Sequence, residues 1–367
     1  MLRLKAFEKL MLLVLFVMLC CVGNAGAVKW RFQSPLSPGD DGVKIWKMFV
    51  DKVAEYSKGE LTMELLLAGS SGISQAQYLA AYSQNLVECG DLLSIMHPGE
   101  LGNWVHISSL NGWVFRSPRA VVDVQREIRP IFADALKKHG VIMLSFLNAV
   151  LTADGVAPIF SRKELRNEDD FKGLRLRIPG EIQKQYIWSK LGVNAVAIPL
   201  TDLYLAMSRG LCDAAKSGTQ RMLALRINEV APYLYVDTYV ASLTPAMIVC
   251  SKLAFDSLSE SAKAALLKAG QEVEKVFWED IFWNPGKYGL YSEEKAMREA
   301  QSKGMKLAAL PDKLIDKLAA FAYEGMNDLA QKSGAEGMAY LAAIRKANEK
   351  YREIESPIHA FLKTVAK

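Results

Sequence analysis

Cysteine and histidine are scarce in this sequence, which limits the metal and disulfide chemistry that it supports. Its 367 residues include five cysteines and four histidines. Two of the cysteines lie in an N-terminal leader, and the other three, Cys89, Cys212 and Cys250, are too few and too scattered for a disulfide framework. We expect these three to be small buried core residues, with at least one unpaired. No two histidines form an HExxH motif or a close pair, so neither a metal site nor a cofactor is predicted.

Catalytic motifs are absent as well. The chain contains no GxSxG and no HExxH sequence, which are signatures of nucleophilic and zinc-dependent hydrolysis. The glycine-rich segment 69–72 lacks both the GxGxxG spacing and the lysine of a phosphate-binding loop, so it predicts a tight strand-to-helix turn beside a ligand cleft. We therefore predict that the protein is not an enzyme, and an exported carboxylate-processing enzyme is the weaker alternative.

Long apolar runs are confined to the N-terminus. Three basic residues precede the apolar run 10–22, and Ala25-Gly26-Ala27 follows it as an A-x-A cleavage site, a pattern typical of a secretory signal peptide. The apolar run is too short to span a bilayer comfortably. Residues 1–27 are thus predicted to be a signal peptide cleaved near Ala27, which places the mature protein in the periplasm.

The chain also lacks a strong excess of charge. Its 45 basic and 40 acidic residues give a formal net charge of +5, and removal of the leader, with three basic residues and one acidic residue, lowers this to +3. Basic and acidic residues alternate along the chain and form no patch, so a nucleic-acid partner is not predicted.

What the sequence does contain is an alternation of strand and helix patterns that predicts an α/β fold. Strands are expected at 28–33, 61–67 and 92–96, the second buried on both faces, with helices at 41–57 and 74–86 between them. This is βαβαβ winding, which favours a parallel sheet with helices on both faces. A helix at 118–139 and a strand at 141–147 follow, and the length of the chain exceeds one typical hydrophobic core.

The second half repeats this pattern. We expect strands at 174–178, 195–198, 214–217 and 247–250, a helix from about 201 to 208, and long helices at 257–282 and from 312 onward. The helix–glycine–aspartate–strand element near 85–92 has an echo at 207–214. We interpret the chain as two lobes built alike.

One short strand carries the candidate binding group. Leu174, Leu176 and Ile178 alternate with Arg175 and Arg177, so the two arginines share the face opposite the core. Pro179-Gly180 is expected to end this strand, and the carboxyl ends of strands in open α/β sheets are where ligands bind. A guanidinium holds a carboxylate through two parallel hydrogen bonds, which lysine does not reproduce. A basic strand face in water is the alternative, and these residues alone favour it.

The stretches FKGLRLRIPG and LGVNAVAIPLTDLYLAMSRGLCDA resemble two motifs of the substrate-binding proteins of TRAP (tripartite ATP-independent periplasmic) transporters, "KGLKxRxP" and "LGAxPVxxPxxEVYxALxxGxVDG". The resemblance covers nearly all of the mature chain. The matching positions are Lys172, Gly173, Leu174, Arg177, Pro179, Leu191, Gly192, Pro199, Tyr204, Ala206, Gly210 and Asp213.

This resemblance implies a two-lobed periplasmic-binding-protein fold with mixed sheets, helices on both faces and a long helix spanning the lobes. Lobe I is expected at 28–150 plus 241–285 and lobe II at 151–240 plus 286–367, with the ligand cleft between them. The resemblance also implies that Arg177 pairs with the ligand's carboxylate, whereas Arg175, at a position where the family often has lysine, is expected to have a surface role.

Other candidate ligand contacts lie where the chain departs from the family. Many members have a second arginine in the stretch that matches 147–152, where this chain offers only Asn148. Members that bind keto acids or sialic acid have Glu-Trp or Glu-Asn where this chain has Lys216-Ser217, so Lys216 lies in the cleft or at its rim. His97, in the loop after the third strand, is either a switchable charge or a structural residue. Further candidates are Ser34 and Ser70 in the loops after the first two strands.

The predicted function is that of a periplasmic receptor that binds a small organic carboxylate and delivers it to the integral membrane subunits of a TRAP permease. The alternative is a ligand sensor for a signalling receptor, which would need the same fold and pocket. Keto or hydroxy acids, dicarboxylates, sugar acids and aromatic acids all stay open as ligands, as does a monomer or homodimer.

Overall fold

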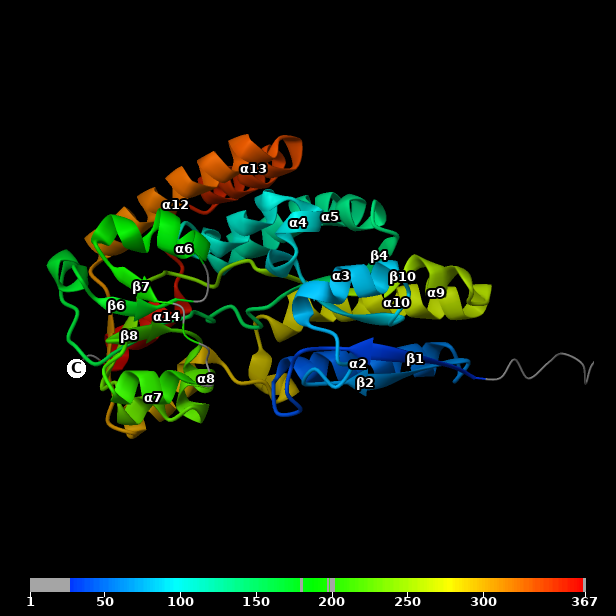
Figure 1. Ribbon diagram of the computed structural model, residues 1–367, viewed down its shortest axis with the longest axis horizontal. Helices are drawn as coiled ribbons and strands as arrows, with labels where there is room; N and C mark the ends of the chain where they lie inside the picture. The colour runs from blue at the N-terminus through cyan, green and yellow to red at the C-terminus, as the bar shows by residue number, and fades with distance from the viewer. Residues whose placement is uncertain (1–26, 179–180, 197, 199–201, 366–367) are drawn as a thin grey trace, which may run out of the picture.

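The computed structural model describes residues 27–178, 181–196, 198 and 202–365, and they form two lobes that each contain one sheet (Figure 1). The expected signal peptide up to residue 26 and the expected strand end at Pro179-Gly180 lie outside these residues. The strand order is β2-β1-β3-β10-β4 in the first sheet and β11-β9-β5-β8-β6-β7 in the second. The α/β class and the two-lobed architecture predicted from the sequence are confirmed.

The first sheet combines parallel and antiparallel strands. β1, β2 and β3 run parallel, as the predicted winding requires, and β10 runs antiparallel to β3 and β4. The strands are β1 (Val28–Gln33), β2 (Leu61–Leu66), β3 (Cys89–Leu93), β4 (Val141–Asn148) and β10 (Pro245–Ser251), and the principal helices are α2 (Gly42–Tyr56), α3 (Tyr78–Ser83), α5 (Pro118–Lys137) and α10 (Glu260–Val276).

Two predictions for this lobe are wrong. The third strand lies earlier than 92–96, because Ser94–Met96 turns into a 3₁₀ helix directly after β3. The second strand is not buried on both faces, because β2 is the edge strand of its sheet. Glu64 of β2 is exposed and pairs with Lys29 at 2.7 Å, and such charges keep an edge strand from pairing with other chains.

The second sheet contains two strands that the sequence patterns did not predict, β5 (Ile159–Ser161) and β9 (Tyr233–Val236). Its other strands are β6 (Arg175–Arg177), β7 (Asn194–Val196), β8 (Ala214–Lys216) and β11 (Lys306–Ala309). The lobe also contains α6 (Glu181–Tyr186), α7 (Leu203–Ser208), α8 (Thr219–Ala224), α11 (Glu293–Ser302) and α14 (Pro357–Val365).

The two lobes repeat one local arrangement. In β1, the backbone N–H and guanidinium of Arg31 donate to Glu88, and in β6 the same groups of Arg175 donate to Asp213. Phe32 pairs with Cys89 as Leu176 pairs with Ala214. The predicted echo is therefore real but shifted, because Asp213 corresponds to Glu88 and not to Asp91. By this register Gln33 corresponds to Arg177, and Asp91 corresponds to Lys216.

The segment that crosses from the second lobe back to β10 is held by two asparagines of the first lobe. Asn148, at the end of β4, donates to the carbonyl of Ser242 at 2.9 Å and accepts from the N–H of Thr244 at 2.8 Å. Asn111 bonds in the same way to both backbone groups of Leu243, at 2.8 and 3.0 Å. These bonds fix the backbone at the base of the cleft.

Two long helices lie side by side on one side of the molecule, and one of them, α12 (Asp312–Ser333), contacts both lobes (Figure 1). α12 contacts 3₁₀ segments of the first lobe and α6 of the second, and α13 (Ala335–Lys350) packs on α5. A Cβ at Gly325 of α12 would lie within 2.8 Å of both Tyr186 and Leu110, so the absence of a side chain permits this approach. The expected assignment of 286–367 to lobe II does not hold for α13, because its apolar face is buried against α5.

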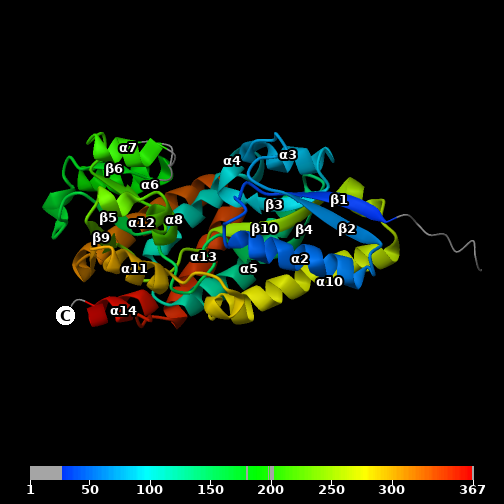
Figure 2. The same cartoon turned by 90° about the horizontal axis from the view of Figure 1, so that it is seen from below.

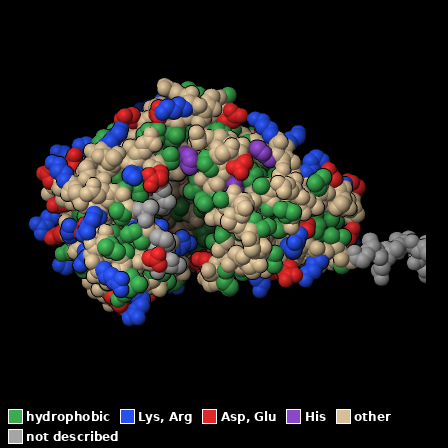
Figure 3. Space-filling model, in the orientation of Figure 1, with side chains coloured by type: hydrophobic (Ala, Val, Ile, Leu, Met, Phe, Trp, Pro, Cys, Tyr) green, Lys and Arg blue, Asp and Glu red, His purple; other side chains and the backbone are tan. Residues whose placement is uncertain are grey.

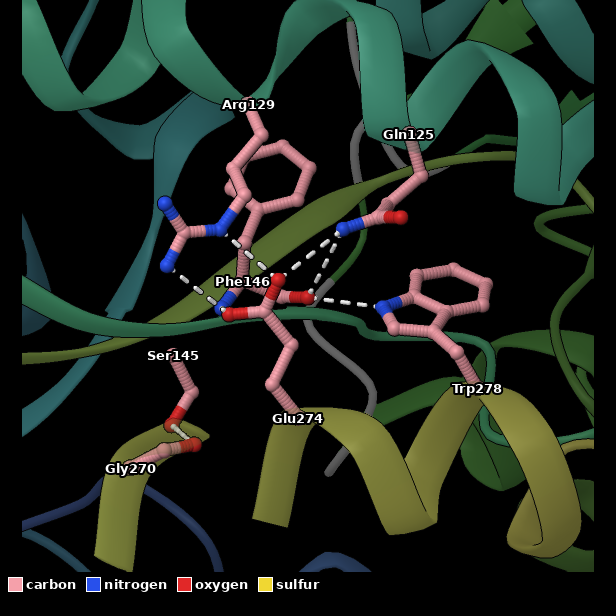
Figure 4. Close-up of polar contacts among 7 residues, drawn as sticks. All are labelled: Gln125, Arg129, Ser145, Phe146, Gly270, Glu274 and Trp278. Atoms are coloured by element: carbon pink, nitrogen blue, oxygen red, sulfur yellow. Dashed lines mark hydrogen bonds and ion pairs between the residues drawn. The ribbon is translucent and has the colours of Figure 1, made fainter. Parts of the chain in front are cut away.

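On the opposite side, α10 lies along α2 and against the edge strand β4 (Figures 1 and 2). The unpaired edge of β4 is satisfied by side chains, as Figure 4 shows. Glu274 accepts the N–H of Phe146 at 2.9 Å and pairs with Arg129 at 2.7 Å, while Trp278 donates to the carbonyl of Phe146 at 2.8 Å. This cluster supplies the hydrogen bonds that a neighbouring strand would otherwise provide.

The described part of the chain contains no helix that is long and apolar enough to cross a membrane. Cys89, Cys212 and Cys250 are all buried and unpaired, which confirms the expectation that they are core residues.

Candidate functional site

A cleft separates the two lobes, and Figure 3 shows the molecule hollowed between them. Two cavities lie in this region. The outer cavity, of about 590 Å³, is lined by loops and strand ends of the first lobe and by Gln220 and Arg221 of α8 from the second. The inner cavity, of about 210 Å³, is lined by Ile95, Trp113 and neighbouring residues of the first lobe and by Lys216, Thr238 and others of the second. Both are placed at the carboxyl ends of β3 or β8, where α/β sheets bind ligands.

Arg177 ends β6, and its guanidinium is partly buried. It is not among the residues that line either cavity, but it contacts Lys216 of the inner cavity and lies near Arg221 of the outer cavity. Its Nε donates to the carbonyl of Ile198 at 3.1 Å, and one terminal nitrogen donates to the carbonyl of Lys216 at 3.2 Å. Burial lowers the pKa of Arg177, and the nearby Arg221 lowers it further, but a guanidinium stays charged in any protein environment. Among the residues that the structure places, no carboxylate pairs with Arg177, so its charge is available to an anion.

Arg175 contrasts with Arg177 although both belong to β6. Its guanidinium donates to both carboxylate oxygens of Asp213, at 3.0 and 2.9 Å. Asp213 also accepts from the backbone of Arg175 and pairs with Lys163 at 3.2 Å. The charge of Arg175 is thus neutralised within the lobe, in a structural role.

Lys216 points into the protein rather than to the rim. Only 4% of it is exposed, and it lines the inner cavity. Its Nζ forms an ion pair with the fully buried Asp237. Trp113 completes the cluster, since its indole N–H donates to Asp237 at 3.2 Å and its ring lies 5.2 Å from Nζ. Burial lowers the pKa of Lys216, and Asp237 opposes this effect. The positive charge is therefore present in the cleft but already compensated.

The remaining predicted contacts are distributed differently. Asn148 lines the outer cavity, but both ends of its amide bond to the crossing segment. Ser34 is buried and donates to Asp91 at 2.7 Å. Ser70 is exposed in its turn, and Ser217 is partly buried beside Lys216. Their roles as ligand contacts stay predictions.

His97 is fully buried, and neither ring nitrogen has a hydrogen-bond partner in the described residues. Burial lowers its pKa, which favours the neutral imidazole. It is not among the residues that line either cavity. Its part in ligand binding likewise stays a prediction.

Several cavity residues were not among the predicted contacts. Asp91, Trp46 and Arg221 line the outer cavity, and Trp113 lines the inner one. The available sequence signal was the glycine directly before Asp91, at the start of the expected third strand. Within the described residues, no group of three potential ligands could hold a metal ion.

Comparisons with known proteins agree on one family. A model of the family described as bacterial extracellular solute-binding protein, family 7, matches residues 33–322. A monocarboxylate 2-oxoacid-binding periplasmic protein of Nostoc sp. is 39% identical over 219 residues, 57% of this chain and 56% of that protein. A solute-binding protein of Albidiferax ferrireducens is 25% identical over 259 residues, 69% of this chain and 73% of its own length.

A solved structure has the same fold. An extracytoplasmic solute receptor of Bordetella pertussis that binds pyroglutamic acid superposes with a TM-score of 0.71. The alignment covers 87% of this chain and 100% of the receptor, at 20% sequence identity.

Proposed function

We propose that this chain, which belongs to bacterial extracellular solute-binding protein family 7, is a periplasmic receptor that captures a small organic carboxylate between its two lobes. The observation that supports the proposal is the guanidinium of Arg177, which is partly buried, bonds to the carbonyl of the cavity residue Lys216 and has no carboxylate partner among the described residues. Taking such a charge out of water is costly unless an anion compensates it, and a planar guanidinium matches a carboxylate in two hydrogen bonds.

Two of the similar proteins support a carboxylate as ligand. One is named for monocarboxylate 2-oxoacids and the other binds pyroglutamic acid, and both compounds are small organic acids. Under this proposal the receptor is exported by the N-terminal signal and has no catalytic activity. It passes its ligand to a TRAP-type membrane permease, as the sequence resemblance implies.

Capture follows from the position of the cleft. Since the outer cavity has walls from both lobes, a ligand that contacts both binds the closed arrangement better and shifts the molecule toward it. Closure removes water around Arg177, which strengthens its charged hydrogen bonds.

A thermal-shift screen of the mature protein tests the proposal. The panel contains 2-oxo acids, hydroxy acids, dicarboxylates, sugar acids and lactam acids, with neutral sugars as negative controls. We expect at least one carboxylate to raise the melting temperature, and Arg177→Ala to abolish that shift. Stabilisation by neutral sugars alone, or an unchanged shift in Arg177→Ala, would contradict the proposal.

A further inference from the structure

Asp91 is a buried carboxylate without a cation. Only 7% of the residue is exposed, and Oδ2 accepts a hydrogen bond from the hydroxyl of Ser34 at 2.7 Å. Oδ1 has no hydrogen-bond partner, and no basic side chain pairs with Asp91 among the described residues. A buried carboxyl group with an unused acceptor is costly, because its hydrogen bonds to water are lost and not replaced.

The backbone of Asp91 is held by a side chain of α3. The hydroxyl of Tyr82 donates to the carbonyl of Asp91 at 2.9 Å. A Cβ at Gly90 would lie only 2.2 Å from that hydroxyl, so glycine at this position allows Tyr82 to reach its acceptor. Strand β3 lies between β1 and β10 and keeps its carboxyl end at the cleft.

Asp91 lines the outer cavity together with two other groups suited to a polar ligand. Trp46 lines the same cavity, and its buried indole N–H has no acceptor in the described residues. Arg221 lines it from α8 and makes a long ion pair, of 3.9 Å, with Asp40. The cavity thus presents an acceptor and a donor from the first lobe and a cation from the second.

The internal repeat allows Asp91 to be compared with the corresponding residue of the second lobe, Lys216. Asp91 of β3 and Lys216 at the end of β8 occupy corresponding positions. Lys216 has its countercharge inside the lobe in Asp237, whereas Asp91 has none within the part of the chain that the structure describes. Of these two opposite charges at the cleft, only the negative one is left for a ligand to satisfy.

We propose that Asp91 is a second ligand contact, which selects carboxylates that also carry a hydrogen-bond donor, such as an amine, a lactam N–H or a hydroxyl group. The proposal rests on the function proposed above and names the class of acid that the receptor takes. The carboxylate of the ligand binds the second lobe at Arg177, and its donor binds Oδ1 of Asp91 in the first lobe. A site built around an unpaired acceptor rejects an analogue that lacks the donor, because the acceptor then stays unsatisfied.

The test uses pairs of acids that differ in one donor: proline and tetrahydrofuran-2-carboxylate, pyroglutamate and N-methylpyroglutamate, and lactate and propionate. Isothermal titration calorimetry measures each affinity for the wild type, Asp91→Asn and the control Asp51→Asn, which removes an exposed acid of α2. We expect the donor-bearing member of at least one pair to bind about tenfold or more tightly than its analogue. Asp91→Asn should reduce that ratio to about threefold or less, and Asp51→Asn should leave it unchanged.

Circular dichroism melting of each variant verifies that it is folded before titration. Equal affinities within every pair, no binding by any donor-bearing acid, or a ratio that survives in Asp91→Asn would overturn the assignment of Asp91. Failure of the proposed function is recognised separately, because carboxylate binding would then be indifferent to Arg177→Ala whatever happens at Asp91.

Discussion

At the residue scale, Arg175 and Arg177 show how two positions on one short strand separate a structural side chain from a candidate ligand contact. The alternation of residues 174–178 predicted that both arginines share a face, and the resemblance singled out Arg177. The local sequence could not predict which arginine is neutralised, because the partner Asp213 lies far along the chain, directly before β8. Asp91 was not predicted for a similar reason, because its hydrogen-bond partners Ser34 and Tyr82 lie in other elements.

Replacement of Asp213 by asparagine should destabilise the protein in a pH-dependent way. The hydrogen bonds from Arg175 hold the pKa of Asp213 well below its usual range. A carboxyl group whose pKa is lower in the folded state stabilises the protein at pH values above its unfolded-state pKa of about 4. This stabilisation is lost as the pH falls through the folded-state pKa. We expect Asp213→Asn to lower the free energy of unfolding by about 1–3 kcal/mol at pH 7, and urea titrations at pH 7 and pH 3 should show a smaller difference at the lower pH. An equal difference at both would contradict this explanation.

Asp91 should have the opposite dependence on pH. Burial raises the pKa of Asp91 to about 7, so the folded state binds a proton that the unfolded state releases near pH 4. Stability from this group is present below that value and is lost as the pH rises toward 7. The Asp91→Asn variant, which keeps the acceptor for Ser34, should therefore gain stability relative to the wild type between pH 5 and pH 8 in chemical denaturation. A constant difference across this range would show that Asp91 does not titrate there.

At the scale of elements, the sequence predicted long periodic helices and the strands of the first lobe, whereas β5 and β9, of three and four residues, gave too short a pattern. The ends of β3 and the exposure of β2 were wrong because sheet order, not local pattern, decides which strand is at an edge. The sequence did not predict the hydrogen bonds at the edge of β4 from Glu274, Gln125 and Trp278 (Figure 4). These side chains lie on helical segments that are distant from β4 along the chain.

The packing of α10 on β4 depends on a glycine. A Cβ at Gly270 would lie 2.4 Å from the carbonyl oxygen of Leu144, and the hydroxyl of Ser145 donates to the carbonyl of Gly270 at 3.1 Å. Helix propensity alone predicts that Gly270→Ala stabilises by about 1 kcal/mol. We expect instead a loss of about 1–3 kcal/mol from the clash, measured by urea unfolding.

Gly286→Ala is the matched control, because a Cβ there would have no atom within 4 Å. It should change the unfolding free energy by less than about 0.5 kcal/mol. If Gly270→Ala is as stable as this control, the close approach of α10 and β4 does not constrain the fold.

At the scale of the whole molecule, chain length, the internal repeat and the family resemblance together predicted two lobes with a cleft. The domain boundary failed at α13, whose apolar face packs on a helix of the other lobe. The clamp of segment 242–244 by Asn111 and Asn148 was not foreseen either. A side-chain amide bonded to a backbone far along the chain leaves no local signature.

Ligand-driven closure is the expected behaviour of this architecture. Because both lobes line the outer cavity, addition of a bound carboxylate should reduce the radius of gyration measured by small-angle X-ray scattering. Arg177→Ala with the same carboxylate should keep the dimension of the free protein. A ligand that binds without any change in scattering would show that capture does not involve closure.

The proposed function depends on Arg177, whose guanidinium is expected to hold the carboxylate of the ligand through two parallel hydrogen bonds. Calorimetric titration of Arg177→Lys with the best carboxylate of the screen tests it most directly, since lysine keeps the charge and loses the planar pair of donors. Arg175→Lys is the matched control on the same strand. We expect Arg177→Lys to weaken binding about a hundredfold and Arg175→Lys to retain the affinity of the wild type. Retention of affinity in Arg177→Lys, or an equal loss in both variants, would contradict the two-pronged pairing of Arg177 with the carboxylate.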